Sequence, residues 1–475
     1  MKRIGILCVA LALILALVVP SAAYAAKGTP FTPEPPPNVR PMIFIHGGQG
    51  AVNQFSSSFL RFASNGYPVN YLFAFEWTSR PPYPETAAQR TARLDAFVDS
   101  VLEETGADQV YMLGHSAGTG VARMYFAEPE YAAKVAKYVS LDAGSGSTAP
   151  DGIPTLGLFA ELNESGAINP PRAIIGATNV VIPGKYHVDT STSAESFAEI
   201  YKFFIGEEPA TTDVLPEPPG QVEIAGRAVF FPANIGVGDA TLEIWEVDGA
   251  TGFRIYDEPT ATCTLSGSWY YDGAWGPVKV NGLKHYEIVL LREGYRPHHF
   301  YSEPFTRSNY WIRLLASPPG GVSDILDRSD NHSNMVIIRD KDFRSGDPNV
   351  GDDILEINGV NILEIVTPTT ASLVGIYVFD WHADGVSDLI APIPWLHALH
   401  RLSGIDLYMP AADPPDGTIS LVLTPRDEEG RTQVINVPNW ASSEHAMSVQ
   451  FRDYSQDIDS WIEYVPGQAP GQQGR

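Results

Sequence analysis

Cysteine is almost absent from this 475-residue chain, which contains only Cys8 and Cys263. Cys8 lies in an apolar run, residues 4–19, that follows two basic residues and precedes Ala23-Tyr24-Ala25. This run is short for a membrane span of about 20 residues, and a basic start with an A-x-A site is typical of a cleaved export signal. We therefore expect residues 1–25 to be removed and the protein to be secreted, extracellular or periplasmic. The mature chain then has no intrachain disulfide, and packing alone must stabilise it.

Basic residues are scarce as well, because 31 Lys and Arg stand against 56 Asp and Glu and give a formal net charge of -25. Loss of the two basic residues of the export signal changes this charge from -25 to -27. So acidic a surface repels polyphosphates and anionic membranes, which argues against nucleic acid as a partner. It favours a neutral substrate or an uncharged interface.

Metal-ligand spacing is also missing. His298-His299, His397 and His400 have no matching set of cysteine or acidic partners in the sequence, and the Asp-rich stretches 327–331 and 340–353 lack the complete spacing of a calcium loop. We interpret both stretches as solvated turns and expect no metal and no other cofactor.

Two proline-rich joints, residues 207–221 and 317–321, divide the remaining chain. In residues 36–206 apolar strands alternate with amphipathic helices, which predicts a mostly parallel sheet covered by helices on both faces. The expected strands are Met42–Ile45, Tyr71–Phe75, Val110–Leu113, Tyr138–Leu141, Thr155–Phe159 and Asn179–Ile182.

Two helices of this first domain have clear signals. Leu94, Phe97, Val98, Val101 and Leu102 recur at helical spacing, and Gly106 stands where that helix should stop. The second helix is predicted to begin with a capping box, Thr192-Ser193-Ala194-Glu195, and to end at Gly206.

Beyond residue 221 the pattern changes to short β runs separated by turns, which predicts two all-β domains of sandwich or barrel type, over 222–316 and 322–462. The first of them resembles the transthyretin-like modules of secreted enzymes. Residues 466–475 consist mainly of Pro, Gly and Gln, and we expect a disordered tail. The strands expected in the two all-β domains are 222–224, 228–231, 242–247, 286–291, 310–315, 353–357, 373–379, 418–423 and 433–437.

The motif Gly114-His115-Ser116-Ala117-Gly118 follows an apolar run and opens an amphipathic stretch. A serine hydroxyl is a weak nucleophile, and enzymes activate it on a sharp strand-to-helix turn where a base can reach it. The helix N-terminus also offers free N–H groups to a developing oxyanion. A glycine-rich turn without chemistry is the alternative, and the flanking strand and helix favour a nucleophile elbow with Ser116 as the nucleophile.

The partners of Ser116 are expected on loops after the strands. His187 follows the last expected strand and is our candidate base, whereas His46 ends the first strand and His115 lies within the elbow itself. Two carboxylates follow successive strands, Asp142 and Glu161. We favour Asp142, because its segment turns sharply at the strand end while Glu161 runs into a polar stretch.

The segment His46-Gly47-Gly48-Gln49-Gly50 follows the first expected strand. Amides at this place can point at a tetrahedral intermediate, so we assign the oxyanion hole to the backbone N–H groups of Gly48 and Ala117. A plain tight turn is the alternative. Downstream, we expect Trp77 and Pro81-Pro82-Tyr83 to line an acyl pocket or to form a small lid.

These motifs resemble the α/β-hydrolase superfamily, and within it a group of secreted lipases and carboxylesterases, one of them archaeal, that carry a β-rich C-terminal region. This resemblance supports Asp142 over Glu161 and implies that the C-terminal β region handles long acyl chains. Ala117 departs from the methionine that is common in lipases. The matching pieces are Phe44-Ile45-His46-Gly47, Gly114-His115-Ser116, Ser140-Leu141-Asp142, Asn179-Val180-Val181, Tyr186-His187-Val188, Thr190-Ser191 and Glu195-Ser196-Phe197.

The resulting hypothesis is a serine ester hydrolase, a lipase or carboxylesterase, that cleaves apolar esters such as acylglycerols. Ser116 would attack the ester carbonyl, His187 would take and return the proton, and Asp142 would orient the histidine. The expected partner is a lipid or another apolar ester, with transient contact to a lipid interface. The alternatives are a polyester depolymerase of the same mechanism and a binding or adhesion protein with a degenerate hydrolase domain.

Overall fold

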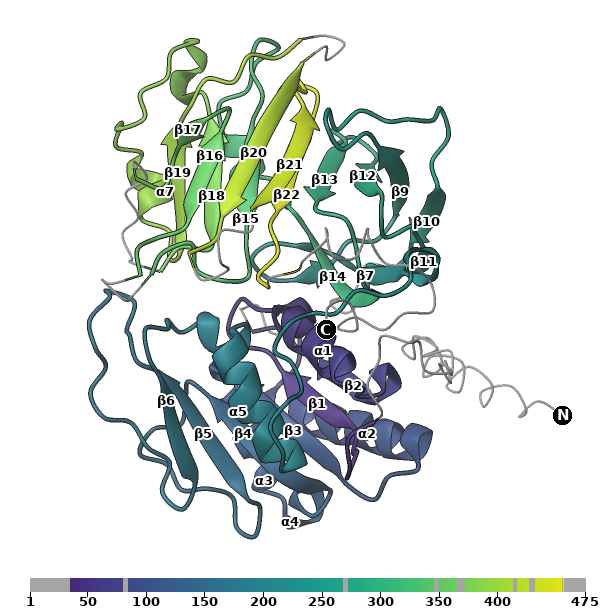
Figure 1. Cartoon of the computed structure of the whole chain (residues 1–475), viewed down its shortest axis with the longest axis vertical. Coiled ribbons are helices and arrows are strands. Elements are labelled where there is room, and N and C mark those ends of the chain that lie inside the picture. Colours follow the sequence, from purple (N-terminus) through teal and green to yellow (C-terminus); the bar gives the residue numbers. More distant parts are fainter. Residues whose placement is uncertain are drawn as a thin grey trace, which may run out of the picture.

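The computed structural model describes residues 35–79, 84–267, 272–345, 350–364, 372–412, 417–426, 432–454 and 456. The predicted export signal, the predicted tail and the Pro81-Pro82-Tyr83 segment lie outside these residues. Figure 1 shows a domain of helices and strands at the bottom of the view and a β-rich region above it.

The first domain contains a six-stranded sheet in the order β2-β1-β3-β4-β5-β6, and every neighbouring pair is parallel. Because helices cover both faces, the four central strands are mostly apolar and buried, whereas the edge strand 178–182 is largely exposed. This architecture confirms the predicted fold class. The strands are β1 (Met42–Ile45), β2 (Leu72–Phe75), β3 (Val110–His115), β4 (Val135–Leu141), β5 (Thr155–Ala160) and β6 (Thr178–Ile182).

Helices cover both faces of this sheet, as Figure 1 shows. Side chains alternate along a strand, so Met42 and Phe44 of β1 pack with α1 (Ser56–Ser64) and α5 (Ala194–Ile205). Ile43 and Ile45 point the other way and pack with α2 (Ala87–Thr105) and α3 (Ala117–Phe126). The short α4 (Pro129–Ala132) follows α3.

The predicted helix ends agree with the structure except at one cap. Gly106 and Gly206 end α2 and α5 with φ angles of 67° and 95°, a left-handed conformation that glycine adopts without strain. The capping box expected at 192–195 is wrong. Ser193 is the N-cap of α5 and accepts from the amide of Ser196, so Glu195 stands one position too early to close a box.

The β-rich region has two sandwiches that share a sheet. An eight-stranded sheet runs β10-β9-β12-β13-β22-β15-β18-β19, and β13 lies parallel to β22 at its centre. The predicted all-β character is confirmed, but the joint at 317–321 does not interrupt this sheet. Its strands are β9 (Ala240–Val247), β10 (Ala261–Leu265), β12 (His285–Arg292), β13 (His298–Ser302), β15 (Met335–Ile338), β18 (Gly375–Phe379), β19 (Leu402–Asp406) and β22 (Ala446–Gln450).

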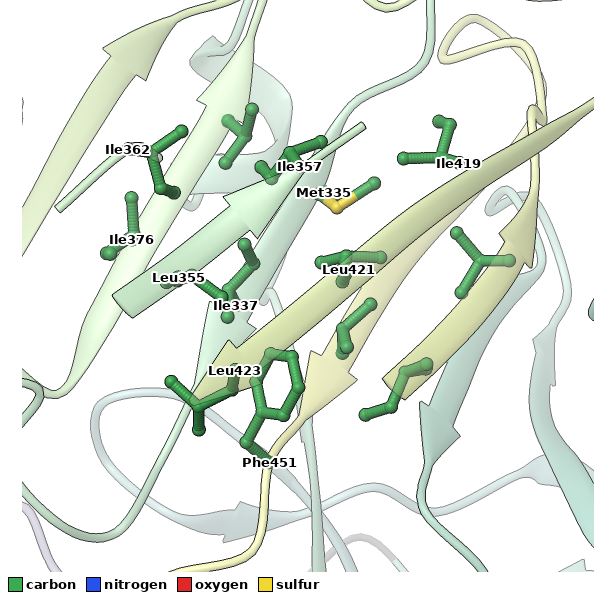
Figure 2. Packing of buried hydrophobic residues seen from close by; sticks show 14 of the residues in the cluster. Met335, Ile337, Leu355, Ile357, Ile362, Ile376, Ile419, Leu421, Leu423 and Phe451 are labelled. Carbon is green, nitrogen blue, oxygen red and sulfur yellow. The ribbon is translucent and has the colours of Figure 1, made fainter. Parts of the chain in front are cut away.

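A smaller sheet packs on each half of the large one. The sheet β11-β7-β14, with β8 paired to β7, shares a core with β9 and β12. The sheet β17-β16-β20-β21 shares a second core with β15, β18, β19 and β22 of the large sheet. Figure 2 shows side chains from both sheets facing one another, among them Ile337, Leu355 and Leu421. The strands are β7 (Glu223–Phe230), β8 (Ile235–Gly236), β11 (Ala274–Lys279), β14 (Asn309–Ala316), β16 (Ile354–Ile357), β17 (Val360–Asn361), β20 (Thr418–Thr424) and β21 (Gln433–Pro438).

The β-rich region packs directly on the first domain. The rings of Phe59 in α1 and Trp311 in β14 lie 4.5 Å apart between centroids, and Figure 1 places β14 next to α1. The proline-rich joint is fixed to the same helix, because the Leu215 amide donates to Ser64 Oγ at 2.9 Å and Val214 is buried. Within the described residues, no helix is both long and apolar enough for a membrane span.

Candidate active site

The turn between β3 and α3 holds Ser116 in a rare conformation, with φ 52° and ψ -121°. A residue other than glycine adopts such a backbone only where its surroundings enforce it. A β-carbon on Gly118 would lie 2.3 Å from the carbonyl oxygen of Ile45, so only glycine lets α3 approach β1 this closely. A β-carbon on Gly47 would lie 3.0 Å from Cβ of Ser116. These glycines allow the turn and the 46–50 segment to meet.

Asp142 and His187 come together after β4 and β6. His187 Nδ1 lies 2.5 Å from Asp142 Oδ2, and the Asp142 side chain is only 4% exposed. Asp142 Oδ1 accepts from the Ala160 amide at 2.9 Å and forms an ion pair with Arg172 Nη2 at 2.7 Å. Burial by itself raises the pKa of Asp142, but the hydrogen bond and charge of His187, the amide and Arg172 together hold this pKa below its ordinary value. The carboxylate is thus ionised, and both of its oxygens have a polar partner.

Backbone contacts join this pair to the serine turn. The Ser116 amide donates to the carbonyl of Leu141, the residue before Asp142, at 2.9 Å. The ring of His115, next to Ser116, lies 4.6 Å from the ring of His187 between centroids. Ser116 and His187 are both half-buried, so the side chains remain open to a substrate.

Glu161, the other carboxylate considered from the sequence, lies elsewhere. Its Oε2 accepts from the Gly184 amide at 2.8 Å and therefore fixes the turn after β6. Among the described residues it is Asp142 that bonds His187.

The two residues whose amides are assigned to an oxyanion hole lie close together. A β-carbon on Gly48 would lie 4.0 Å from Cβ of Ala117, and both residues are exposed. Neither amide donates to another group within the described part of the chain, whereas the amides of Gly47 and Gln49 do. Ala117 is also the first residue of α3, where the helix dipole favours negative charge.

Gln54 and His115 form a hydrogen-bond chain that sequence patterns did not indicate. Gln54 Oε1 accepts from the Gly47 amide at 3.1 Å, and Gln54 Nε2 donates to His115 Nδ1 at 2.8 Å. His115 Nε2 then donates to the carbonyl of His187 at 3.1 Å. Burial, followed by the proximity of His187, lowers the pKa of His115 to about 3, so this imidazole stays neutral and keeps the tautomer that the chain needs.

His46 and Trp77 contact each other and support the 46–50 segment. Trp77 is buried, donates through Nε1 to the His46 carbonyl at 2.9 Å, and stacks on the His46 ring. His46 Nε2 faces Glu76 at 3.1 Å, and Glu76 also pairs with Arg227 of β7 at 3.0 Å. The acyl-pocket expectation for Trp77 is therefore not supported by its contacts.

His299 has a partner that the sequence did not indicate. Its Nδ1 bonds the buried Glu287, and its Nε2 lies 2.8 Å from His445 Nδ1. These residues join β12, β13 and the segment before β22. Across the described ranges, no group of three or more His, Cys, Asp or Glu residues is arranged to hold a metal ion.

Three family models match successive parts of the chain. Residues 39–129 match the lipase (class 2) family, residues 220–319 match the lipase C-terminal domain, and residues 321–455 match a further C-terminal domain family. The first match contains the serine turn and the 46–50 segment.

Solved structures with similarity to the chain include a Listeria innocua gene product and a monoacylglycerol lipase from Paleococcus ferrophilus. The first is 15% identical, with a TM-score of 0.28, over 37% of this chain and 97% of the other. The second is 14% identical, with a TM-score of 0.26, over 37% and 96%. A lipase B from Aspergillus fumigatus is 10% identical, with a TM-score of 0.28, over 38% and 57%.

The fold and the family matches together define the class: an α/β-hydrolase domain of the lipase type followed by a β-rich C-terminal region. This confirms the resemblance seen in the sequence motifs. The match of residues 39–129 to the lipase (class 2) family supports a hydrolase of lipase or esterase type.

Proposed function

We propose that this protein is a secreted serine hydrolase of apolar carboxylic esters, a lipase or carboxylesterase. The observation that carries the proposal is the hydrogen-bonded pair of His187 and Asp142, which the bond from the Ser116 amide to the Leu141 carbonyl joins to the serine turn. Beside that turn stand the amides of Gly48 and Ala117, which donate to no group within the described residues. The class 2 lipase match over residues 39–129 supports the same chemistry. Secretion rests on the export signal in residues 1–25 of the sequence.

The chemistry follows from these positions. Ser116 Oγ attacks the ester carbonyl while His187 takes its proton through Nε2, since Nδ1 is held by Asp142. The ionised Asp142 stabilises the imidazolium that forms. The amides of Gly48 and Ala117 receive the oxyanion, and His187 returns the proton to the leaving alcohol. Water, activated by His187, then hydrolyses the acyl-enzyme.

The preference for apolar esters rests on charge and on the chain between β5 and β6. This segment carries Ile168 and Ile175, which are 72% and 62% exposed, and also Arg172, which contacts Asp142. We propose that these isoleucines face an apolar substrate. The net charge of -25 disfavours an anionic one. A transient contact with a neutral lipid interface fits both observations.

Hydrolysis of p-nitrophenyl esters, from acetate to palmitate, tests this proposal. The mature protein is compared with Ser116→Ala, and with Ser100→Ala on the exposed face of α2 as a matched control. We expect turnover in the wild type and the control and its loss in Ser116→Ala. The rate against chain length separates a lipase from a short-chain esterase. Absence of turnover on every ester would favour the binding or adhesion protein.

A further inference from the structure

The segment that carries Gly48 is held by a residue of the β-rich region. Asn234, in the turn between β7 and β8, donates through Nδ2 to the carbonyl oxygens of Gln49 and Gly50, at 3.1 Å and 2.5 Å. Asn234 is 4% exposed, whereas Gln49 and Gly50 are half-buried, so these hydrogen bonds are partly shielded from water. Gln49 and Gly50 directly follow the amide proposed for the oxyanion hole.

The orientation of the Asn234 side chain is fixed by its own partners. Arg313 Nη1 of β14 donates to Asn234 Oδ1 at 3.3 Å, which leaves Nδ2 to face the two carbonyls. The Asn234 amide donates to the Phe230 carbonyl at 2.8 Å, and its φ angle of 55° belongs to the left-handed region that asparagine tolerates. The donor is thus preorganised.

Arg313 also closes a ring of contacts around the same segment. Its Nη2 lies 3.7 Å from Asp340 Oδ1, and Asp340 Oδ2 accepts from Asn53 Nδ2 at 2.8 Å. Asn53 stands three residues after Gly50. Residues 49–53 are therefore held at both ends from the β-rich region, by Asn234 at one end and by Asp340 at the other.

The catalytic domain holds the opposite side of the segment. Ser79 Oγ accepts from the Gln49 amide at 2.8 Å, and Gln54 accepts from the Gly47 amide. Gln49 itself has a φ angle of 62°. The Gly47 and Gln49 amides, on either side of Gly48, are thus fixed by the catalytic domain. The Gln49 and Gly50 carbonyls are fixed by Asn234 of the β-rich region.

We propose that Asn234 is a positioning residue for the oxyanion hole, which makes the middle β domain a part of the catalytic apparatus. The inference rests on the proposed function, since it assigns a task to the segment around Gly48. Preorganised donors stabilise a transition state only when they stand at the right place, and loss of one donor costs about 10² to 10³ in turnover. Loosening a donor without deleting it costs less, about tenfold to a hundredfold.

Two substitutions remove the donor and keep the backbone unstrained. Asn234→Gly deletes the side chain in a conformation that glycine adopts freely, and Asn234→Asp keeps the shape but replaces the N–H donor by an acceptor. The matched control is Asn358→Gly in the β16–β17 turn, where asparagine has a φ angle of 49° and its Oδ1 accepts from the Ser420 amide.

The measurements are kcat and KM for p-nitrophenyl butyrate, per active site counted by phosphonate titration, and the inhibition constant of a trifluoromethyl ketone. The ketone forms a tetrahedral adduct whose oxyanion occupies the hole. We expect kcat to fall tenfold to a hundredfold in both Asn234 variants, the inhibition constant to rise by a similar factor, and KM to change less than about twofold. Asn358→Gly should behave as wild type.

The inference would be overturned if kcat per titrated site stayed within twofold of wild type. Any activity lost would then equal the fraction of Ser116 that no longer reacts with the phosphonate, as for a merely structural residue. Wild-type turnover that survives in Ser116→Ala would instead overturn the proposed function, and the inference with it.

Discussion

Replacing Asp142 by Asn removes the charge beside His187 and leaves the volume unchanged. The two side chains lie 2.5 Å apart, in a site where the carboxylate is only 4% exposed. Two unit charges about 4 Å apart at an effective dielectric constant of about 20 attract by about 4 kcal/mol, which corresponds to roughly 10³ in rate. The amide can also hold the imidazole in the wrong tautomer. We therefore expect kcat to fall by about 10³ to 10⁴.

The assay is ester hydrolysis at pH 8, with thermal unfolding followed by circular dichroism to verify the fold. Glu161→Gln is the matched control, because Glu161 also follows a strand of the same sheet but bonds the Gly184 amide. We expect the control to keep at least about a third of the activity, since its partner is a backbone amide outside the proton path. Equal losses in both variants, or an Asp142→Asn enzyme with more than about a tenth of wild-type turnover, would refute the reasoning.

Three further perturbations follow from the packing. Gly118→Ala should cost about 1–3 kcal/mol of stability and at least about tenfold in turnover. The reason is that its new β-carbon would lie 2.3 Å from the Ile45 carbonyl oxygen. Unchanged kinetics together with an unchanged midpoint of urea unfolding would contradict this. Phe59→Ala should cost about 3–5 kcal/mol in urea unfolding, since this fully buried ring joins β1 to β14; a loss below about 1 kcal/mol would speak against it. Burial and then the Asp189 carboxylate raise the pKa of Asp342 from 3.8 to about 8. The folded state keeps a proton that the unfolded state loses, so this group destabilises the fold as pH rises from about 4 to 8, and Asp342→Asn should be the more stable form at pH 8 but not at pH 4. A variant that is less stable at pH 8 would contradict this sign.

The catalytic domain was predictable because its signals are local. Strands buried on both faces appear as continuous apolar runs, and the expected 42–45 and 155–159 segments agree with β1 and β5 to within one residue. The helix stops at Gly106 and Gly206 are local for the same reason. In the β-rich region the local signal is weak. β13, with the sequence His-His-Phe-Tyr-Ser, shows no alternation of apolar and polar residues, because its histidines are buried against Glu287 and Ser448 from other strands.

The residues of the candidate site also fall into two groups, those that local sequence signals indicate and those that they do not. Ser116, His187 and Asp142 could be selected from the sequence because each follows an apolar strand, where loops converge. Gln54, Arg172 and Asn234 could not. Their roles depend on contacts between segments that are distant in the chain, and nothing in their neighbouring residues distinguishes them from other polar side chains.

The central claim is that Ser116 is the nucleophile of an ester hydrolase. Reaction of the mature protein with a fluorophosphonate, followed by intact mass and peptide mapping, tests it most directly. We predict one adduct per chain, on Ser116, with loss of esterase activity in proportion to labelling, and no adduct in Ser116→Ala. Adducts on another serine, or full ester turnover in Ser116→Ala, would contradict the account.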